Sequence, residues 1–510
     1  MSTRGDEGTE MQTTDDRSRG FLGRGKTLLA SIAGLSLALL LPAASAAQVK
    51  SAGQLHYPPL PAFAIPQPER IVLDNGMVVM LLEDHELPLV DAVALIHTGA
   101  RLEPAEKAGL AELTGRVLRT GGTSMMTGDQ LDDYLEGKAA VIETSIDEDS
   151  GRATMSSLKA DFPQVLKVFA DVLRHPVFTE PKIQVAKNRM RAEVARQNDE
   201  PDDIVFREFA KVVYGKDSPY ARTPTFASLG RIERRDLVAW HETYYHPERV
   251  VLGLTGDFRR DEALKLVREA FGDWPRGAAV PTVDVPYRKE PAPGVYYAEK
   301  NDMTQSDVIM GGLGIVRNNP DFFAVEVMNH VLSGGFASRL FANVRSKKAL
   351  AYAVFGQVGD GWDHPGLTSL FLTTKTQTTG AGIEALLVEA RNMTAEPPTD
   401  DEVAKARQAI LNSFVFNSDS KRKVLTQQLR FEYFGYPLDW LSRYRAGVEA
   451  VTTAEVRAVA AKYLHPDQFA ILVVGPSKGT DKPLSTFGRV IPVDLTIAQA
   501  PHPATRPGHP

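Results

Sequence analysis

The chain repeats one local pattern in its two halves, and this repeat limits the folds it can adopt. His246-Pro247 leads into an apolar run that ends at Gly256, and His465-Pro466 leads into a similar run that ends at Gly475. The two His-Pro pairs are 219 residues apart, and the helical patterns that precede them correspond at the same offset. A repeat of this length predicts two copies of one α+β unit of about 200 residues.

Proline, glycine and charged residues mark where these units begin and end. We predict domains over 69–278 and 295–480, joined by a linker over 279–294 where proline and charged residues crowd. Residues 48–68 are proline-rich and lack periodicity, so they form an extended lead-in, and 481–510 is predicted to be a disordered tail. Alternation and helical spacing predict strands at 71–73, 77–82, 89–96, 139–146, 152–158 and 250–255, and helices at 130–135, 161–174, 180–197, 203–213 and 233–245.

Composition excludes several classes of function. A net charge of −6 provides no electrostatic attraction for nucleic acid, so no nucleic-acid partner is expected. The chain has no cysteine, which excludes a cysteine nucleophile, thiolate metal sites and disulfides.

The N-terminus has the order of regions that is typical of a secretory signal peptide. Basic residues precede an apolar run over 27–41, and small residues follow at 43–47. We predict a signal peptide over 1–47 with cleavage near Ala46, and therefore a periplasmic or secreted protein. The apolar run is shorter than the roughly 20 residues of a membrane span. An uncleaved anchor remains the alternative.

The segment 108–123 has the pattern of an amphipathic helix. Leu110, Leu113 and Val117 recur at helical spacing, Pro104 is placed at the first turn, and Gly121-Gly122 ends the run.

This helix resembles the signature helix of the M16 (pitrilysin-like) zinc peptidases, which begins G-x-A-H-F-L-E-H and ends G-T. Gly109 and Ala111 match its start, and Gly122-Thr123 matches its end. The Asn75-Gly76 turn and the duplication also fit this family. The resemblance covers roughly residues 68–478. It implies an α+β fold of two tandem M16-type domains, similar to those of LuxS and the mitochondrial processing peptidases, each an antiparallel-rich sheet with packed helices.

The residues that hold zinc in the family are mostly replaced in this chain. The resemblance places Glu112 and Arg116 where the family has its two zinc-binding histidines, and Gly115 where it has the catalytic glutamate. Glu193 matches the third ligand position. We therefore expect no metal or other cofactor at this degenerate zinc site, because a guanidinium group offers no lone pair. Arg116 is expected to pair with Glu193, and with Glu112 as well, in place of the ion. Solvated, unpaired side chains are the alternative.

Two residues of the second half match positions that act on substrate in the family. Arg345 and Tyr352 have the spacing of an Arg/Tyr pair that binds the substrate backbone and stabilises the oxyanion in active M16 peptidases. Without the family, an ordinary helix-end arginine and a strand tyrosine would be the simpler interpretation. Gly334 and Gly335 precede them in a glycine-rich segment that is expected to be a substrate loop.

The resemblance thus implies a non-catalytic, substrate-binding subunit of a heterodimeric M16 peptidase. The partner subunit would carry H-x-x-E-H and the zinc, and the substrate would be a peptide or an unfolded polypeptide. One alternative is a structural or peptide-binding assembly protein derived from the family. Another is an autonomous metallopeptidase with an unorthodox metal site. Whether the chain is an enzyme therefore depends on the complex it forms.

Overall fold

The computed structural model describes residues 65–280, 283–414, 416 and 418–498. The predicted signal peptide, most of the predicted lead-in and the end of the predicted tail lie outside these ranges. Within them, no helix combines the length and the apolar character needed to cross a bilayer.

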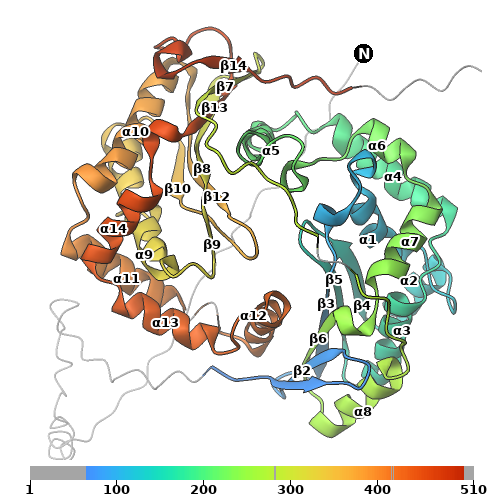
Figure 1. Cartoon of the computed structure of the whole chain (residues 1–510). Helices are drawn as coiled ribbons and strands as arrows, with labels where there is room; N and C mark the ends of the chain where they lie inside the picture. The colour runs from blue at the N-terminus through green and yellow to red at the C-terminus, as the bar shows by residue number, and fades with distance from the viewer. Residues whose placement is uncertain (1–64, 281–282, 415, 417, 499–510) are drawn as a thin grey trace, which may run out of the picture. The chain divides into compact units, whose positions relative to one another are not determined.

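The first half is built on a six-stranded sheet in the order β1-β2-β6-β3-β5-β4. Helices α1, α3, α7 and α8 lie on one side of this sheet (Figure 1). The elements are β1 (Glu69–Val72), β2 (Val78–Glu83), β3 (Leu89–Ile96), α1 (Leu110–Thr120), α2 (Gly128–Gly137), β4 (Val141–Ile146), β5 (Gly151–Leu158), α3 (Phe162–Arg174), α4 (Glu180–Ala195), α5 (Pro201–Tyr214), α6 (Phe226–Arg231), α7 (Arg234–Tyr244), β6 (Val250–Gly256) and α8 (Arg260–Phe271).

The second half is built on a sheet in the order β10-β12-β8-β13-β7-β14. Helices α9, α10, α11, α13 and α14 belong to this half (Figure 1). The elements are β7 (Gly294–Glu299), β8 (Gln305–Leu313), β9 (Ile315–Val316), α9 (Phe322–Ser333), the π-helix η6 (Leu340–Lys347), β10 (Ala353–Gln357), β11 (Asp360–Gly361), β12 (Leu367–Lys375), α10 (Thr379–Ala395), α11 (Asp400–Phe414), α12 (Lys421–Phe434), α13 (Trp440–Ala450), α14 (Thr453–Tyr463), β13 (Ala470–Gly475) and β14 (Val490–Pro492).

The two sheets follow the same order, which confirms the predicted duplication and the fold class. Strands β6 and β13 are the repeated apolar runs, and each lies inside its sheet between one parallel and one antiparallel neighbour. Both strands are buried along almost their whole length, because both faces of each sheet are covered. Strands β4 and β10 occupy equivalent edges of the two sheets.

The predicted disordered tail is partly wrong. Residues 490–492 form β14, which pairs in parallel with β7 at the edge of the second sheet. In the first sheet the equivalent edge is occupied by β1, which pairs with β2. The tail therefore completes the second sheet at the position where the first sheet uses its own N-terminal strand. The strand is only three residues long and contains Pro492, so it shows no alternating pattern that would distinguish it from a proline-rich tail.

Each half lends one helix to the sheet of the other half. Helix α12 packs on β2, β3 and β6, where Leu425, Leu429 and Tyr433 join an apolar cluster with Met80 and Val251. Helix α5 packs on β8 and β13 of the second sheet. There it forms a second apolar cluster with strand residues of that sheet, and the residues of α5 in this cluster are Ile204, Val205, Phe209, Val212 and Val213. This exchange explains why residues 65–510 form one compact unit.

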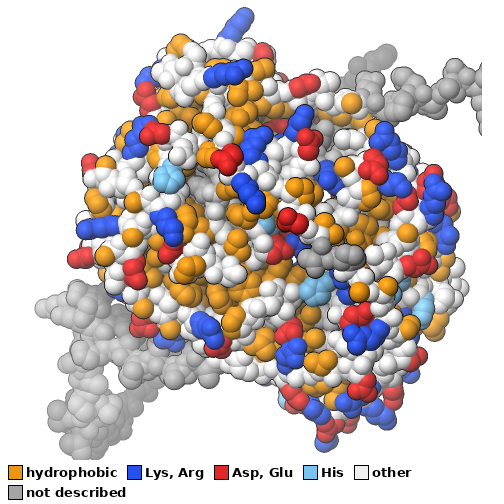
Figure 2. Space-filling model, viewed as in Figure 1, with side chains coloured by type: hydrophobic (Ala, Val, Ile, Leu, Met, Phe, Trp, Pro, Cys, Tyr) orange, Lys and Arg blue, Asp and Glu red, His pale blue; other side chains and the backbone are white. Residues whose placement is uncertain are grey.

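Charged side chains of both signs alternate over the face of the molecule shown in Figure 2. No patch of a single sign dominates that face, in keeping with the small net charge of −6.

Candidate functional site

The structure brings Glu112, Arg116 and Glu193 together on two neighbouring helices. Glu112 and Arg116 lie one turn apart on α1, and Glu193 lies near the end of α4, which packs against α1. Arg116 donates from Nη1 to Glu193 Oε1 at 3.0 Å and from Nη2 to Glu193 Oε2 at 2.8 Å, and it also bonds to Glu112. The predicted ion pair is therefore present as a two-pronged guanidinium–carboxylate contact.

A buried carboxylate fixes the start of α1. Glu103 accepts the backbone N–H groups of Gly109 and Ala111 at 2.9 and 3.0 Å, and so caps a helix that has no side-chain cap of its own. Burial raises the pKa of Glu103 to about 7, against the lowering effect of these two bonds. The predicted helix start was wrong. Pro104 precedes a separate short 3-10 turn over Ala105–Lys107. Helix α1 begins only after Gly109, whose left-handed backbone (φ +97°) separates the two elements.

Gly115 lies where α1 touches the edge strand β4. A Cβ at this position would meet the backbone nitrogen of Ile146 at 2.4 Å and the carbonyl carbon of Ser145 at 2.7 Å. The contact is also held by Thr144, whose hydroxyl donates to the Gly115 carbonyl at 2.7 Å. Helix and strand therefore approach so closely that no side chain fits at Gly115.

Arg345 and Tyr352 are exposed on the second half. Arg345 lies in the π-helix η6 with its guanidinium 4.8 Å from the ring centre of Phe341, and Tyr352 directly precedes β10 with 75% of its surface exposed. Among the described residues, neither side chain has a hydrogen-bond or ion-pair partner in this chain, and neither contacts Arg116 or Glu193. Their predicted role on substrate therefore stays a prediction.

The predicted substrate loop lies just before η6. A Cβ on Gly334 would meet the His330 ring at 2.0 Å, while Gly335 has a φ of +98° and open space around it. The next residue, Phe336, is 82% exposed and packs edge-on against Phe341. The loop thus presents an aromatic ring to solvent next to Arg345, although nothing in the fold assigns it a ligand.

Five histidines of the first half have structural partners. His85 bonds to Asp257, His175 to Asp171, and His241 and His246 to backbone carbonyls. His97 stacks on Tyr433.

Comparison with known proteins identifies the family. Residues 78–222 match the description "Insulinase (Peptidase family M16)", and residues 231–410 match "Peptidase M16 inactive domain". The chain belongs to the M16 peptidase family.

Its relatives include proteins named both as proteases and as non-peptidases. It is 23% identical to "Uncharacterized zinc protease YmxG" of Bacillus subtilis, over 80% of this chain and 98% of that protein. It is also 23% identical to "Non-peptidase homolog YmxG" of Helicobacter pylori, over 78% and 92% of the two chains.

Solved structures confirm the M16 fold. A peptidase M16 inactive domain from Pseudomonas fluorescens superposes with a TM-score of 0.74 at 25% identity, covering 82% of this chain and all of that one. The periplasmic protease PqqL of Escherichia coli superposes at 0.70 and 14% identity, over 81% of this chain and 47% of PqqL. The chain is thus an M16 protein of the inactive type.

The residues at the M16 zinc position do not fit a zinc ion. Arg116 places a permanent cation there, and its guanidinium occupies both carboxylate oxygens of Glu193, the one ligand residue that is retained. At Gly115 the strand backbone excludes the side chain of a general base. The site can therefore hold α1 against α4, but it cannot activate water through a metal.

We expect Arg116→Ala to lower the melting temperature, because the variant removes the guanidinium that bridges Glu112 and Glu193 and leaves Glu193 only its longer contact with Arg189. The three side chains are 29%, 36% and 42% exposed, so solvent screening limits the loss to about 0.5–1.5 kcal/mol. Arg189→Ala is the matched control, since Arg189 is 77% exposed and approaches Glu193 only to 3.5 Å. Thermal unfolding in low and high salt checks this. An unchanged melting temperature for Arg116→Ala would contradict a stabilising ion pair.

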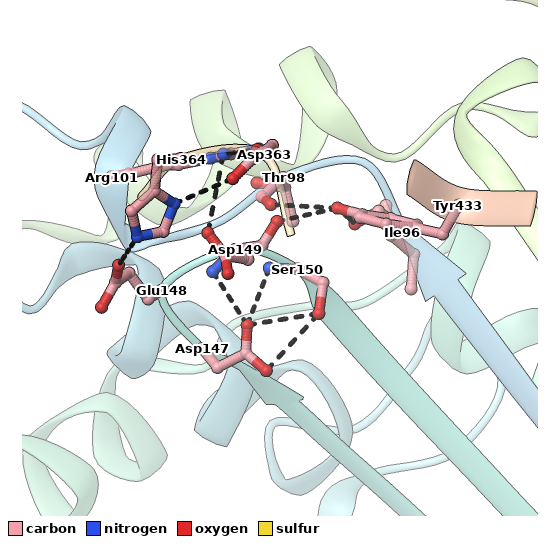
Figure 3. Close-up of polar contacts among 10 residues, drawn as sticks. All are labelled: Ile96, Thr98, Arg101, Asp147, Glu148, Asp149, Ser150, Asp363, His364 and Tyr433. Atoms are coloured by element: carbon pink, nitrogen blue, oxygen red, sulfur yellow. Dashed lines mark hydrogen bonds and ion pairs between the residues drawn. The ribbon is translucent and has the colours of Figure 1, made fainter. Parts of the chain in front are cut away.

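Sequence reasoning missed one polar cluster, at the junction of the two halves. Glu148 and Asp149 lie in the turn between β4 and β5, and His364 and Asp363 lie in the loop before β12 (Figure 3). Arg101 bonds to Asp363 and lies 3.5 Å from Asp149 Oδ1. The acidic turn is visible in the sequence, but no local pattern connects it to a histidine in the other half.

Proposed function

We propose that this chain is the non-catalytic, substrate-binding subunit of a heterodimeric M16 zinc peptidase. The partner subunit would carry the H-x-x-E-H helix and the zinc, and Arg345 and Tyr352 would complete its active site. One observation carries the proposal. The chain's own zinc position is filled by Arg116 and closed at Gly115, whereas Arg345 and Tyr352 are exposed and uncommitted.

The chemistry of the pair suits this role. When a peptide carbonyl is attacked, its oxygen becomes negative, and donors aimed at that oxygen lower the barrier. A guanidinium fork and a phenol can both donate to such an oxygen. An arginine that is already bound to a carboxylate would have to give up that partner first, and Arg345 has no such partner among the described residues.

The edge of the first sheet offers a place for the substrate backbone. Strand β4 lies at the sheet edge beside α1, and its Val141 is 52% exposed. An extended peptide can add to a free strand edge through main-chain hydrogen bonds, which recognise backbone rather than sequence. Such binding would suit peptides or unfolded segments of varied sequence.

We further propose that the complex acts outside the cytoplasm. The basic, apolar and small-residue regions of the first 47 residues support export, and the absence of cysteine is compatible with it.

The test is co-expression with an H-x-x-E-H M16 subunit, followed by peptide cleavage assays on the purified complex. Arg345→Ala and Tyr352→Phe should each lower kcat/KM by about 100-fold or more, which is the usual effect of losing one oxyanion donor. Lys348→Ala, at an exposed cation three residues from Arg345, should retain activity within about twofold. Gel filtration should show that all variants still form the complex.

Other outcomes would favour the rival functions. A stable complex whose turnover is indifferent to both substitutions would indicate a structural or peptide-binding assembly protein. Peptide cleavage by the purified single chain, abolished by a chelator, would indicate an autonomous metallopeptidase.

A further inference from the structure

The turn between β4 and β5 presents two carboxylates on a rigid support. Asp147 accepts the backbone N–H groups of Asp149 and Ser150 at 3.0 and 2.7 Å, which closes the turn. The Asp149 carbonyl accepts a hydrogen bond from the Tyr433 hydroxyl at 2.8 Å. The backbone polar groups are thereby engaged, and the carboxylates of Glu148 and Asp149 remain to face the loop of the second half (Figure 3).

His364 enters this site from the second half with a fixed orientation. Its side chain is nine-tenths buried, and its ring stacks on Tyr220 at 3.8 Å between ring centres. Nδ1 lies 2.9 Å from Asp363 Oδ1. With an ionised Asp363, Nδ1 carries the ring proton and donates a hydrogen bond to this carboxylate. The lone pair of Nε2 then points at Glu148 Oε1, 3.7 Å away and too far for a hydrogen bond.

The donor atoms are therefore arranged around a gap that would suit a metal ion. One ligand atom each from Glu148, Asp149 and His364 lies within 4.8 Å of the other two. Ligand atoms bound to zinc at about 2.0–2.2 Å stand roughly 3.3–3.6 Å apart in a tetrahedron. The 3.7 Å between His364 Nε2 and Glu148 Oε1 is already close to this separation, while the pairs that include Asp149 lie within 4.8 Å and would have to close further by side-chain rotation. The bond from His364 to Asp363 is also the outer-shell contact that metal-bound histidines usually make.

Charge and access also favour a cation. Asp149 Oδ1 is buried and accepts no hydrogen bond, although the Arg101 guanidinium lies 3.5 Å away, so it has room for a further donor or ion. A cavity of about 520 Å³ reaches Glu148, Asp149 and His364 and provides an entry path. Arg152 and Arg430 also line this cavity, and Arg101 lies beside it. The carboxylates of Asp147, Glu148, Asp149 and Asp363 outnumber these three guanidinium groups.

We propose that Glu148, Asp149 and His364 bind one divalent transition-metal ion of the zinc type, which joins the two halves of the chain. One imidazole nitrogen and two carboxylate oxygens suit Zn²⁺, whereas Ca²⁺ prefers oxygen ligands alone. This site differs from the degenerate zinc site, and it departs from the sequence-based expectation of a chain without metal. Its role is structural, and it does not depend on the proposed peptidase partner.

The test is calorimetric titration of Zn²⁺ into the purified, chelator-treated chain without any partner. We expect one ion to bind and to raise the melting temperature by a few degrees, and Ca²⁺ to do neither. Glu148→Gln and His364→Gln should each weaken Zn²⁺ affinity by at least about tenfold. Circular dichroism without metal checks that both variants are folded.

His85→Gln is the matched control, since His85 also lies beside two carboxylates, Asp257 at 2.7 Å and Glu83 at 3.4 Å, but on the surface. This variant and Glu193→Gln should bind Zn²⁺ like the unmodified chain. The proposal is overturned if the unmodified chain binds no Zn²⁺, if Glu148→Gln and His364→Gln bind it equally well, or if only Glu193→Gln weakens it. None of these results would bear on the role of Arg345 and Tyr352.

Discussion

Replacing Gly115 by alanine should destabilise the protein by up to about 2 kcal/mol, although alanine is the better helix former. The added Cβ would meet the backbone of Ile146 at 2.4 Å and that of Ser145 at 2.7 Å. Backbone atoms cannot rotate away as a side chain can, so either α1 or β4 must move. Overpacking of this kind typically costs 1–3 kcal/mol, which outweighs the roughly 1 kcal/mol gained from helix propensity. Chemical unfolding followed by circular dichroism measures the difference.

Gly137 provides the matched control for this substitution. It lies at the end of α2, and a Cβ there would have no atom within 4 Å. Gly137→Ala should therefore be neutral or stabilising by up to about 1 kcal/mol, opposite in sign to Gly115→Ala. Equal effects at the two glycines would contradict a closed helix–strand contact.

The same contact predicts that the zinc motif cannot be restored by substitution alone. The triple variant Glu112→His, Gly115→Glu and Arg116→His would rebuild the family's ligand pattern, with Glu193 as the third ligand. We expect this variant to be less stable than the unmodified chain and to cleave no peptide. The absent chemistry is therefore a property of the backbone as well as of three side chains.

Sequence reasoning reached the degenerate zinc site because its residues follow a local spacing. Glu112 and Arg116 are one helical turn apart, so one resemblance placed both, and charge complementarity then predicted the bond to Glu193. The closure at Gly115 was not predictable, because it depends on the separation between α1 and β4. The cluster of Glu148, Asp149 and His364 was missed for a related reason, since only tertiary structure joins a first-half turn to a second-half loop.

The fold followed the sequence where periodicity was strong and departed from it where packing decided. The repeated apolar runs became the inner strands β6 and β13, because burial on both faces demands apolar residues at every position. Strand β14 was missed, since three residues that include a proline are too few to show the alternation of a strand. The exchange of α5 and α12 between the halves was also invisible, because an amphipathic helix does not reveal which sheet it covers.

Replacing Leu429 by alanine should cost about 2–5 kcal/mol and destabilise both halves together. Leu429 is fully buried on α12, and it packs so closely on the first sheet that its side chain fills the space above Gly253. Because α12 belongs to the second half and covers the first, losing this contact weakens the junction between them. Scanning calorimetry should therefore record one unfolding transition, shifted to lower temperature as a whole.

The control is the same substitution at an exposed leucine. Leu87 is 62% exposed, so Leu87→Ala removes the same atoms without opening a cavity and should change stability by less than about 0.5 kcal/mol. Two separate transitions in Leu429→Ala, with only one of them shifted, would contradict the coupling, since the halves would then unfold independently. A single shifted transition would mean that each sheet relies on a helix from the other half. A chain built in this way holds its exposed Arg345 and Tyr352 in a fixed relation to the first sheet only while both exchanged helices remain in place.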